Sequence, residues 1–583
     1  MQYVVCLLAF GSPSSLPFAH ARIKSSNFTY IFASCHTPKE ERSCRPKHAK
    51  PTASCHEERR FGRGCIMQLS RRQFIVGIGG AGALGALGGV LGGCAPQQAS
   101  ENQGTGIAEG NGYMPAQWDE EADIVIVGGG GAGGAAAYAG RKAGVDVLVL
   151  ESQSSTTFSS TALSGDSICF VGTEEQAAAG IEDSAEAFMQ ECLELGEHAN
   201  KEEVIQTYLD HNLEYYEILK EIGVQFEGVV MLDTYTPRTL NFSSAEHQQL
   251  LTEATQELGA RYLFETSGKR LYVDAAGTVC GVEASKDGKT IAVKARKAVL
   301  MCTGGITRNK EMLDECIAGL GDVDAGSGVG NTGEGHIACL QLGSKFHGRP
   351  SVYSPEGMHP GSVSMEGFAQ MYDFGAIKVN INGDRFMDES LGWCAAATRA
   401  TLEQPQKDGR YFNWQIVDQI GYDLAKECTD TRGVREENEG YFVSAPSLEE
   451  LQNLIGAPNL VETVNRYNSD IIAGNADAQG RTTLTGEGSD AIRPLDSPPY
   501  YAYANVPVIT FAPTVGIEID GEGRALDQYG NPIGNDRLYL AGEIMLRNLI
   551  GNKYKIFGLA VGGGCTFGVY CANKAAQLEN WDA

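Results

Sequence analysis

A glycine-rich turn between a buried strand and a helix constrains this chain more than any other feature. Residues 123–127 read Asp-Ile-Val-Ile-Val, a continuous apolar run typical of a parallel strand that is covered on both faces. The run leads into Gly128, Gly130 and Gly133, which have the G-x-G-x-x-G spacing. We expect Gly128 to allow a tight turn, Gly130 to let the backbone approach a pyrophosphate, and Gly133 to let helix and strand pack closely.

The residues that follow complete the pattern of a dinucleotide site. A helix predicted over about 132–142 would direct its first N–H groups, beginning at Ala132, towards the phosphates. A second predicted strand over 145–150 ends at Glu151, 18 residues after the last glycine of the turn, where a carboxylate can bind ribose hydroxyls. Strand, helix and acid together predict a Rossmann-like α/β domain. This pattern alone leaves both NAD and FAD open.

Composition narrows the class of protein. The 583 residues are enough for two to four domains, and a formal net charge of −27 argues against nucleic-acid binding. Ten of the 16 cysteines are scattered from Cys169 to Cys571 without any C-x-x-C pair, which argues against a zinc ribbon or a ferredoxin-type run. No metal site is assigned. We interpret these cysteines as buried or free thiols, with a cluster of iron and sulfur held by distant cysteines, or disulfides, as the alternatives.

The first part of the chain resembles an export signal. Residues 70–75 read S-R-R-Q-F-I, which resembles a twin-arginine signal, and a short apolar run then leads to L-G-G-C ending at Cys94, which resembles a lipobox. The sequence predicts a non-mature N-terminus over 1–66, a twin-arginine lipoprotein-type signal over 67–94 and a linker over 95–120. We expect an extracytoplasmic protein whose contact with the cell membrane is a lipid at Cys94.

Three later segments resemble the FAD-dependent fumarate reductase and 3-oxosteroid dehydrogenase flavoprotein family. Residues 299–305 (V-L-M-C-T-G-G) resemble its second FAD-contacting segment, with Cys302 in the usual place of alanine, and 537–543 (R-L-Y-L-A-G-E) resemble its third. Residues 158–166 resemble the loop along the flavin, although three glycines usual in that loop are replaced. The resemblance implies FAD as the cofactor, with contacts from Ser160, Thr161, Ser164, Gly165, Thr303, Gly304, Gly305, Gly542 and Glu543.

Shorter matches, such as the T-G-D-G-like turn at 331–335, extend the resemblance over nearly all of the chain beyond Asp123. The family architecture implies a Rossmann-like FAD-binding domain built from residues 121–345 and 496–583. An α+β capping domain would be inserted at 346–495. We expect the substrate to lie between the cap and the flavin, since clefts between domains commonly bind ligands.

The residues expected of the fumarate branch are replaced here. Its histidines fall on Ala512-Pro513, its acid arginine falls near Trp393, and its C-terminal H-G-A-N-R-L-G-G is missing. Tyr554 and Gly558 instead have the spacing of the carbonyl-binding pair in the 3-oxosteroid dehydrogenase branch. There a tyrosine hydroxyl and a glycine N–H form an oxyanion hole. The resemblance therefore implies a neutral carbonyl substrate, with ordinary packing as the alternative for this pair.

A glycine run at 562–564 is predicted to precede a helix. Its N-terminus, with Val561 and Gly562, would face the flavin and stabilise the reduced anionic form. Close helix packing is the alternative interpretation of these glycines.

The proton donor has several candidates. Tyr353 and Arg399 are assigned to the catalytic site, and Tyr235 and His359 are further possibilities. Each has an ordinary structural alternative: packing for the tyrosines, a loop position for the histidine and a solvated surface for the arginine.

Together these features predict an exported FAD-dependent ene-reductase. Hydride would pass from reduced flavin to the β-carbon of an α,β-unsaturated carbonyl or lactone of steroid-like shape. The resemblance to the cardiac glycoside reductases of gut actinobacteria implies a lactone of that type. Because the chain has no C-x-x-C-H haem motif, electrons would come from a membrane-bound multihaem cytochrome or a similar donor. The alternatives are a 3-oxosteroid dehydrogenase running the reverse reaction and a non-catalytic flavin lipoprotein for electron relay or ligand binding.

Overall fold

The computed structural model describes residues 112–230, 235–348, 356–361, 367–392, 394–428, 432–485, 489–509 and 514–583. The predicted export signal, the lipobox and Tyr353 lie outside these residues. Within them, no helix is both long and apolar enough to cross a membrane.

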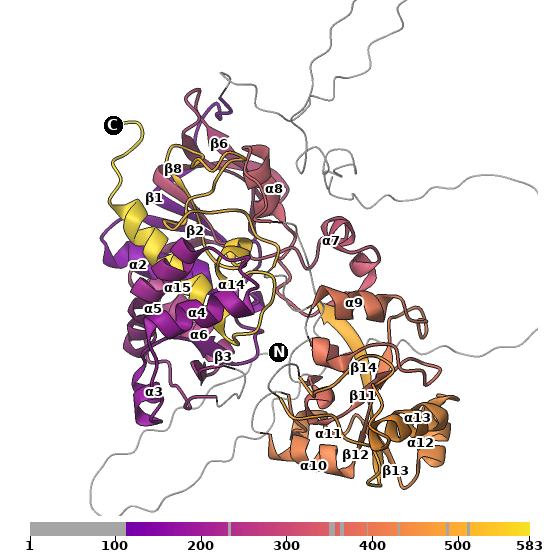
Figure 1. Cartoon of the computed structure of the whole chain (residues 1–583). Coiled ribbons are helices and arrows are strands. Elements are labelled where there is room, and N and C mark those ends of the chain that lie inside the picture. The colour runs from indigo at the N-terminus through magenta and orange to yellow at the C-terminus, as the bar shows by residue number, and fades with distance from the viewer. Residues whose placement is uncertain are drawn as a thin grey trace, which may run out of the picture. The chain divides into compact units, whose positions relative to one another are not determined.

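A seven-stranded sheet forms the core of the part that carries the glycine-rich turn (Figure 1). Strand β1 pairs in parallel with both β2 and β8, and the C-terminal strand β15 pairs in parallel with β8. The sheet is therefore completed by a segment from the far end of the chain. Its strands, in spatial order, are β5 (Arg261–Leu263), β2 (Val147–Leu150), β1 (Glu120–Val127), β8 (Lys289–Met301), β7 (Val279–Lys286) and β6 (Thr266–Val273), with β15 (Leu538–Leu540) beside β8.

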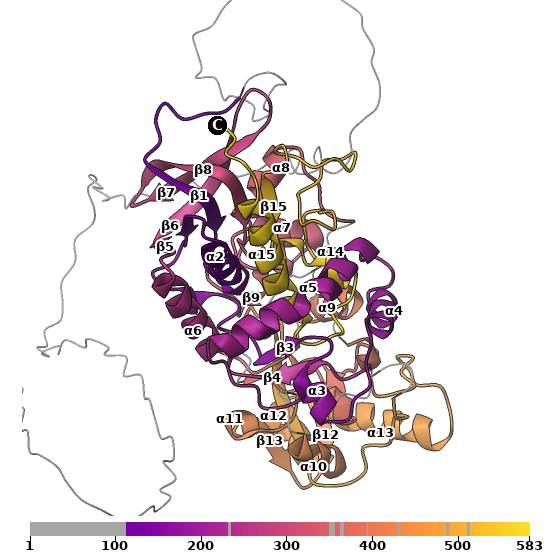
Figure 2. The same ribbon diagram turned by 90° about the vertical axis from the view of Figure 1, so that its left-hand side faces the viewer.

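Two glycine-rich helices, α2 (Gly131–Lys142) and α15 (Leu559–Ala576), pack side by side next to this sheet (Figure 2). Because glycine has no side chain, the backbones of the two helices can approach closely. A Cβ on Gly133 would lie 1.9 Å from the carbonyl oxygen of Gly128, and one on Gly568 would lie 2.3 Å from that of Ala132. The glycines thus bring the phosphate-binding turn and the C-terminal helix together.

Further elements belong to the same part of the chain. They are α3 (Glu174–Ala178), α4 (Ala185–Leu195), α5 (Glu202–Glu221), α6 (Ser244–Glu257), α7 (Lys310–Cys316), α8 (Glu334–Gln341), α14 (Arg547–Ile550) and a two-stranded sheet of β3 (Ser167–Cys169) and β4 (Thr239–Asn241).

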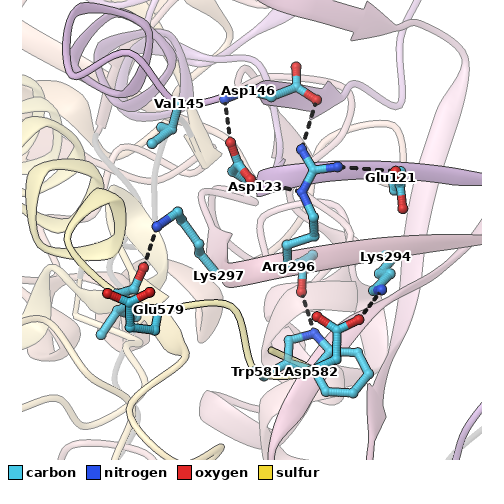
Figure 3. Close-up of polar contacts among 12 residues, drawn as sticks. Glu121, Asp123, Val145, Asp146, Lys294, Arg296, Lys297, Glu579, Trp581 and Asp582 are labelled. Carbon is cyan, nitrogen blue, oxygen red and sulfur yellow. Dashed lines mark hydrogen bonds and ion pairs between the residues drawn. The ribbon is translucent and has the colours of Figure 1, made fainter.

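Arg296 ties together three parts of the main sheet (Figure 3). Its guanidinium donates to Asp123 on β1 at 2.8 Å and to Glu121 at 3.1 Å. Asp123 also accepts the backbone N–H of Asp146, just before β2, at 2.8 Å. Near the C-terminus, the Trp581 indole donates to the carbonyl of Ala295 at 2.8 Å. These contacts fix the register of the strands that lead to the glycine-rich turn.

A second, six-stranded sheet belongs to the inserted part of the chain. Its long strand β14 (Tyr500–Ile509) pairs antiparallel with β12 and in parallel with β9, so this sheet extends past residue 495. The exact bounds of the cap stay a prediction. The sheet comprises β10 (Glu356–Met358), β14, β12 (Asn413–Asp418), β11 (Ile377–Val379), β13 (Phe442–Ala445) and β9 (Asp324–Ala325), and its helices are α9 (Ala395–Leu402), α10 (Gln419–Glu427), α11 (Glu436–Glu439), α12 (Leu448–Ile455) and α13 (Leu460–Ile472).

Buried ions hold the interior of this inserted part. Arg481 is fully buried and donates to the carbonyls of Ala376 and Tyr372 at 2.8 and 2.7 Å. It also forms an ion pair with Glu389 at 3.3 Å, and the same carboxylate binds Arg385. Because buried charges need partners, these contacts explain Arg385, Glu389 and Arg481 by structure rather than by catalysis.

Candidate functional site

A long pocket opens where β1, β2, β8 and β15 end. It brings together segments that lie hundreds of residues apart, as expected for a ligand site at the carboxyl ends of parallel strands. The predicted site residues that line it are Gly128, Gly130, Ala132, Glu151, Ser160, Thr161, Ser164, Gly165, Thr303, Gly304, Gly542, Glu543, Tyr554, Gly558 and Val561.

The glycine-rich turn has the geometry of a phosphate cradle. Gly128 has φ +102°, and a Cβ there would lie 2.3 Å from the carbonyl oxygen of Cys302. Gly130 precedes the first turn of α2, and the turn from Gly130 to Ala132 lines the pocket without any acidic side chain. The N–H groups of this helix end therefore face the pocket as a site for an anion. Gly133 lies behind the turn and serves packing.

Glu151 lies at the end of β2 with its carboxylate held in place. One oxygen accepts the backbone N–H of Gly129 at 2.7 Å, and the other accepts that of Gln153 at 2.8 Å. The side chain is 8% exposed and lines the pocket. A carboxylate fixed in this way retains lone pairs for the hydroxyls of a ribose.

Asn331 orients the second acid of the pocket. Its Nδ2 donates to Ser160 Oγ at 2.9 Å and to Glu543 Oε2 at 3.3 Å. A Cβ on Gly304 would lie 2.4 Å from Asn331 Oδ1, and one on Gly305 would lie 2.3 Å from Glu543 Oε1. Gly304 lines the pocket, whereas Gly305 makes room for Glu543 from behind. The sequence analysis gave Asn331 no role, although this residue begins the T-G-D-G-like turn at 331–335.

These features fit FAD. A helix N-terminus for a pyrophosphate and two fixed carboxylates for hydroxyl groups line one continuous pocket. The glycines at 128, 304 and 305 occupy positions where any Cβ would collide with neighbouring atoms.

The C-terminal helix begins earlier than the sequence predicted. α15 starts at Leu559 after Gly558, so the glycine run at 562–564 lies inside the helix and not before it. The run serves close packing, because a Cβ on Gly562 would lie 2.3 Å from the carbonyl oxygen of Cys169. Val561 lines the pocket, and Gly562 does not. The N-terminus that faces the pocket is therefore one turn earlier than expected.

Tyr554 and Gly558 meet on the pocket wall, but their arrangement differs from two donors converging on a ligand. The Gly558 N–H donates to the Tyr554 hydroxyl oxygen at 2.9 Å. Burial raises the pKa of the Tyr554 phenol, so its hydroxyl stays protonated at ordinary pH. The glycine amide thus polarises the tyrosine, whose O–H is the group suited to bind a carbonyl.

The lining of the pocket is more apolar than polar. Arg432 is the single basic residue among the described residues that line the pocket, and its Nη1 lies 3.1 Å from Asp373 Oδ2. No motif marked Arg432, because it comes from a loop whose place follows from tertiary structure. The apolar lining residues of the pocket include Leu163, Val230, Phe368, Leu546 and Phe557.

The other candidate donors are placed differently. Arg399 is exposed on α9 and does not line the pocket, so the structure does not bring it to the site. His359 stacks on Tyr441 with ring centroids 3.5 Å apart. Tyr235 lies behind the wall, where its hydroxyl accepts the backbone N–H of Phe557 at 2.9 Å.

The ten cysteines from Cys169 to Cys571 are free thiols. Burial raises the pKa of several of them, as for Cys339 and Cys565, to about 12. In the described part of the chain, no three His, Cys, Asp or Glu residues are arranged to hold a metal ion. The described residues therefore provide no ligand set for the alternative of an iron–sulfur cluster.

Residues 123–554 match the model of the FAD binding domain family. The chain belongs to this family. The predictions of an FAD cofactor, an α/β FAD-binding fold with a capping domain, and an oxidoreductase acting on CH–CH and C=C bonds are confirmed.

Relatives from both predicted branches resemble the chain. It is 27% identical to digoxin reductase of Eggerthella lenta over 89% of its own length and 99% of the relative. The open conformation of a flavocytochrome c3 fumarate reductase has a TM-score of 0.64 at 24% identity, covering 79% of both chains. The 3-ketosteroid-Δ4-(5α)-dehydrogenase from Rhodococcus jostii RHA1, in complex with 4-androstene-3,17-dione, has a TM-score of 0.59 at 23% identity, covering 79% of this chain and 98% of that chain. These two structures share the fold.

Proposed function

We propose that the protein is an exported ene-reductase for a neutral, steroid-like α,β-unsaturated carbonyl or lactone. The observation that carries the proposal is a largely apolar pocket whose lining includes Tyr554, with a protonated hydroxyl that Gly558 polarises. The one basic side chain among the described lining residues, Arg432, is already paired with Asp373. A lining whose described residues hold no uncompensated cation disfavours a dicarboxylate and favours a neutral carbonyl. The likeness to a digoxin reductase supports a lactone substrate.

Bound FAD and the residues of the pocket have separate roles in the proposed reaction. Bound FAD supplies hydride transfer. Tyr554 donates its O–H to the carbonyl oxygen, which gains negative charge as hydride adds at the β-carbon, and its contribution is therefore greatest in the transition state. The apolar side chains exclude water, while Arg432, held by its ion pair with Asp373, supplies a polar group that orients the substrate.

Export and electron supply are part of the proposal. The twin-arginine-like residues at 70–75 and the lipobox-like Cys94 support an extracytoplasmic protein with a lipid anchor. Because the chain lacks a C-x-x-C-H haem motif, a membrane-bound multihaem cytochrome or a similar protein would deliver the electrons. The fold likeness to a flavocytochrome fumarate reductase is compatible with such a donor.

An anaerobic assay tests this function. Purified protein with reduced viologen would be given an unsaturated steroid lactone, an enone or fumarate, and separately a saturated 3-ketosteroid with a dye acceptor. We expect turnover of the lactone or enone and a marked loss of kcat in Tyr554→Phe. Turnover of the saturated ketone alone would establish the dehydrogenase alternative, and turnover of fumarate alone would overturn the neutral substrate. An electron relay without substrate chemistry would reduce none of the three.

A further inference from the structure

We propose that Tyr235 and Thr239 position the carbonyl-binding Tyr554 by forming hydrogen bonds to the backbone N–H and C=O of Phe557. The inference rests on the proposed role of Tyr554 and deepens it. The two residues are called the Phe557 bracket below. They lie more than 300 positions before Phe557 in the sequence, so the contact is purely tertiary.

The bracket satisfies both backbone groups of Phe557. Tyr235 Oη accepts the Phe557 N–H at 2.9 Å, and Thr239 Oγ1 donates to the Phe557 carbonyl oxygen at 2.8 Å. That carbonyl belongs to the same peptide group as the Gly558 N–H, which donates to Tyr554 Oη. The Thr239 contact therefore sets the plane of the peptide whose N–H polarises Tyr554.

The bracket is itself held by a buried ion cluster. Arg238, between its two members, is fully buried and donates to both carboxylate oxygens of Asp183 at 2.8 and 2.7 Å. Arg238 also pairs with Glu191, which accepts from Thr236 Oγ1 at 2.7 Å. A bidentate pair of this kind fixes backbone direction as well as charge. The segment that carries the bracket is thus anchored independently of the loop that it grips.

The opposite side of the loop has no room to move. Gly558 has φ +79°, and a Cβ there would lie 2.6 Å from the backbone of Ile168. The loop is therefore confined between β3 and the bracket. Removing the Thr239 hydroxyl would free the 557–558 peptide to rotate, and removing the Tyr235 hydroxyl would release the 556–557 peptide directly before it. In both cases we expect the Gly558 N–H to leave the Tyr554 hydroxyl.

Tyr235 is a positioning residue by this account. It does not line the pocket, whereas Thr239 does. Burial raises the pKa of Tyr235, so the phenol is neutral and its oxygen remains an acceptor for an amide. Its effect on the reaction should then pass through Tyr554 and should vanish when the Tyr554 hydroxyl is absent.

A double-mutant cycle tests this coupling. Tyr235→Phe, Tyr554→Phe and the double variant would be compared by kcat and KM for enone reduction with reduced viologen. We expect Tyr235→Phe to lower kcat about tenfold with little change in KM, yet to change kcat less than about twofold in the Tyr554→Phe background. Flavin content and Tm should stay close to wild type.

Matched variants complete the test. Tyr216→Phe removes another buried tyrosine hydroxyl, which donates to Glu175 at 2.9 Å, and should leave kcat unchanged. Thr239→Val should lower kcat, and Thr239→Ser, which keeps the hydroxyl, should restore it. The bracket alone would be overturned if kcat were unchanged in both Tyr235→Phe and Thr239→Val. It would also be overturned if Tyr235→Phe lowered kcat by the same factor with Tyr554 present and in the Tyr554→Phe background. Wild-type kcat in Tyr554→Phe would instead overturn the proposed function, and the bracket with it.

Discussion

Asn331 donates one amide group to two partners, Glu543 Oε2 at 3.3 Å and Ser160 Oγ at 2.9 Å. The three residues come from separate segments of the chain, and all line the pocket. Asn331 is 5% exposed, so its hydrogen bonds do not compete with bulk water. The amide therefore fixes the carboxylate of Glu543 before any ligand arrives, which is the preorganisation that cofactor binding requires.

Replacing Asn331 by aspartate should weaken FAD binding without unfolding the protein. The change removes both donors and places a second carboxylate beside Glu543, where like charges repel. We expect the apparent Kd for FAD to rise about tenfold, which corresponds to about 1.4 kcal/mol. Fluorescence titration of apoprotein with FAD measures it. Asn465→Asp, on an exposed position of α13, is the control, and equal affinities in the two variants would contradict the role given to Asn331.

A substitution at Gly305 tests by steric displacement whether FAD binding depends on the position of the Glu543 carboxylate. A methyl group at this position would lie 2.3 Å from Glu543 Oε1, closer than any real contact, so Gly305→Ala should displace the carboxylate. We expect loss of bound flavin, seen as a lower ratio of flavin to protein absorbance after purification. Gly440→Ala, where a Cβ meets nothing within 4 Å, should retain full flavin. Normal flavin occupancy in Gly305→Ala would show that FAD binding does not require the Glu543 carboxylate in this position.

The parts of the site that the sequence predicted are those that local pattern determines. The run from Asp123 through Gly128 to Glu151 is strand, turn, helix and strand in direct succession, so apolar periodicity and glycine spacing were sufficient. The start of α15 was misplaced because the run at 562–564 is unfavourable to a helix on propensity alone. Tight contacts of Gly562 and Gly564 with Cys169 and Gly542 override that preference.

The roles of other residues could not have been assigned without the fold. Asn331, Arg432 and Tyr235 act through contacts with residues distant in sequence, and no spacing rule connects them to their partners. Arg399 shows the converse. It was a candidate proton donor, but its helix leaves it exposed, and it does not line the pocket.

The ion cluster behind the Phe557 bracket should matter for stability as well as position. Asp183→Asn leaves the fully buried Arg238 with only one carboxylate partner, Glu191. Breaking a buried pair from one side typically costs about 3–5 kcal/mol, and we expect the free energy of unfolding in urea to fall by about that amount. Glu221→Gln breaks the exposed pair with Lys142 and should hardly change it. Similar losses in the two variants would contradict the importance of the buried cluster.

Two buried histidines should make the fold sensitive to mild acid. Burial lowers the pKa of His247 and of His336 to about 4, below the ordinary value of 6.5. Between these values the unfolded chain binds protons that the fold excludes, so stability is complete above about pH 6.5 and falls as the pH drops towards 4. A shift of that size corresponds to roughly 3 kcal/mol for each histidine.

His247→Gln tests this expectation for one of the two histidines. The glutamine does not titrate, but it keeps a side-chain partner for the Tyr215 hydroxyl, which lies 2.5 Å from His247 Nε2. Urea unfolding at pH 7, 6, 5 and 4 should therefore show a shallower loss of stability in His247→Gln than in the exposed control His198→Asn. Parallel curves for the two variants would show that His247 is not the group that takes up the proton.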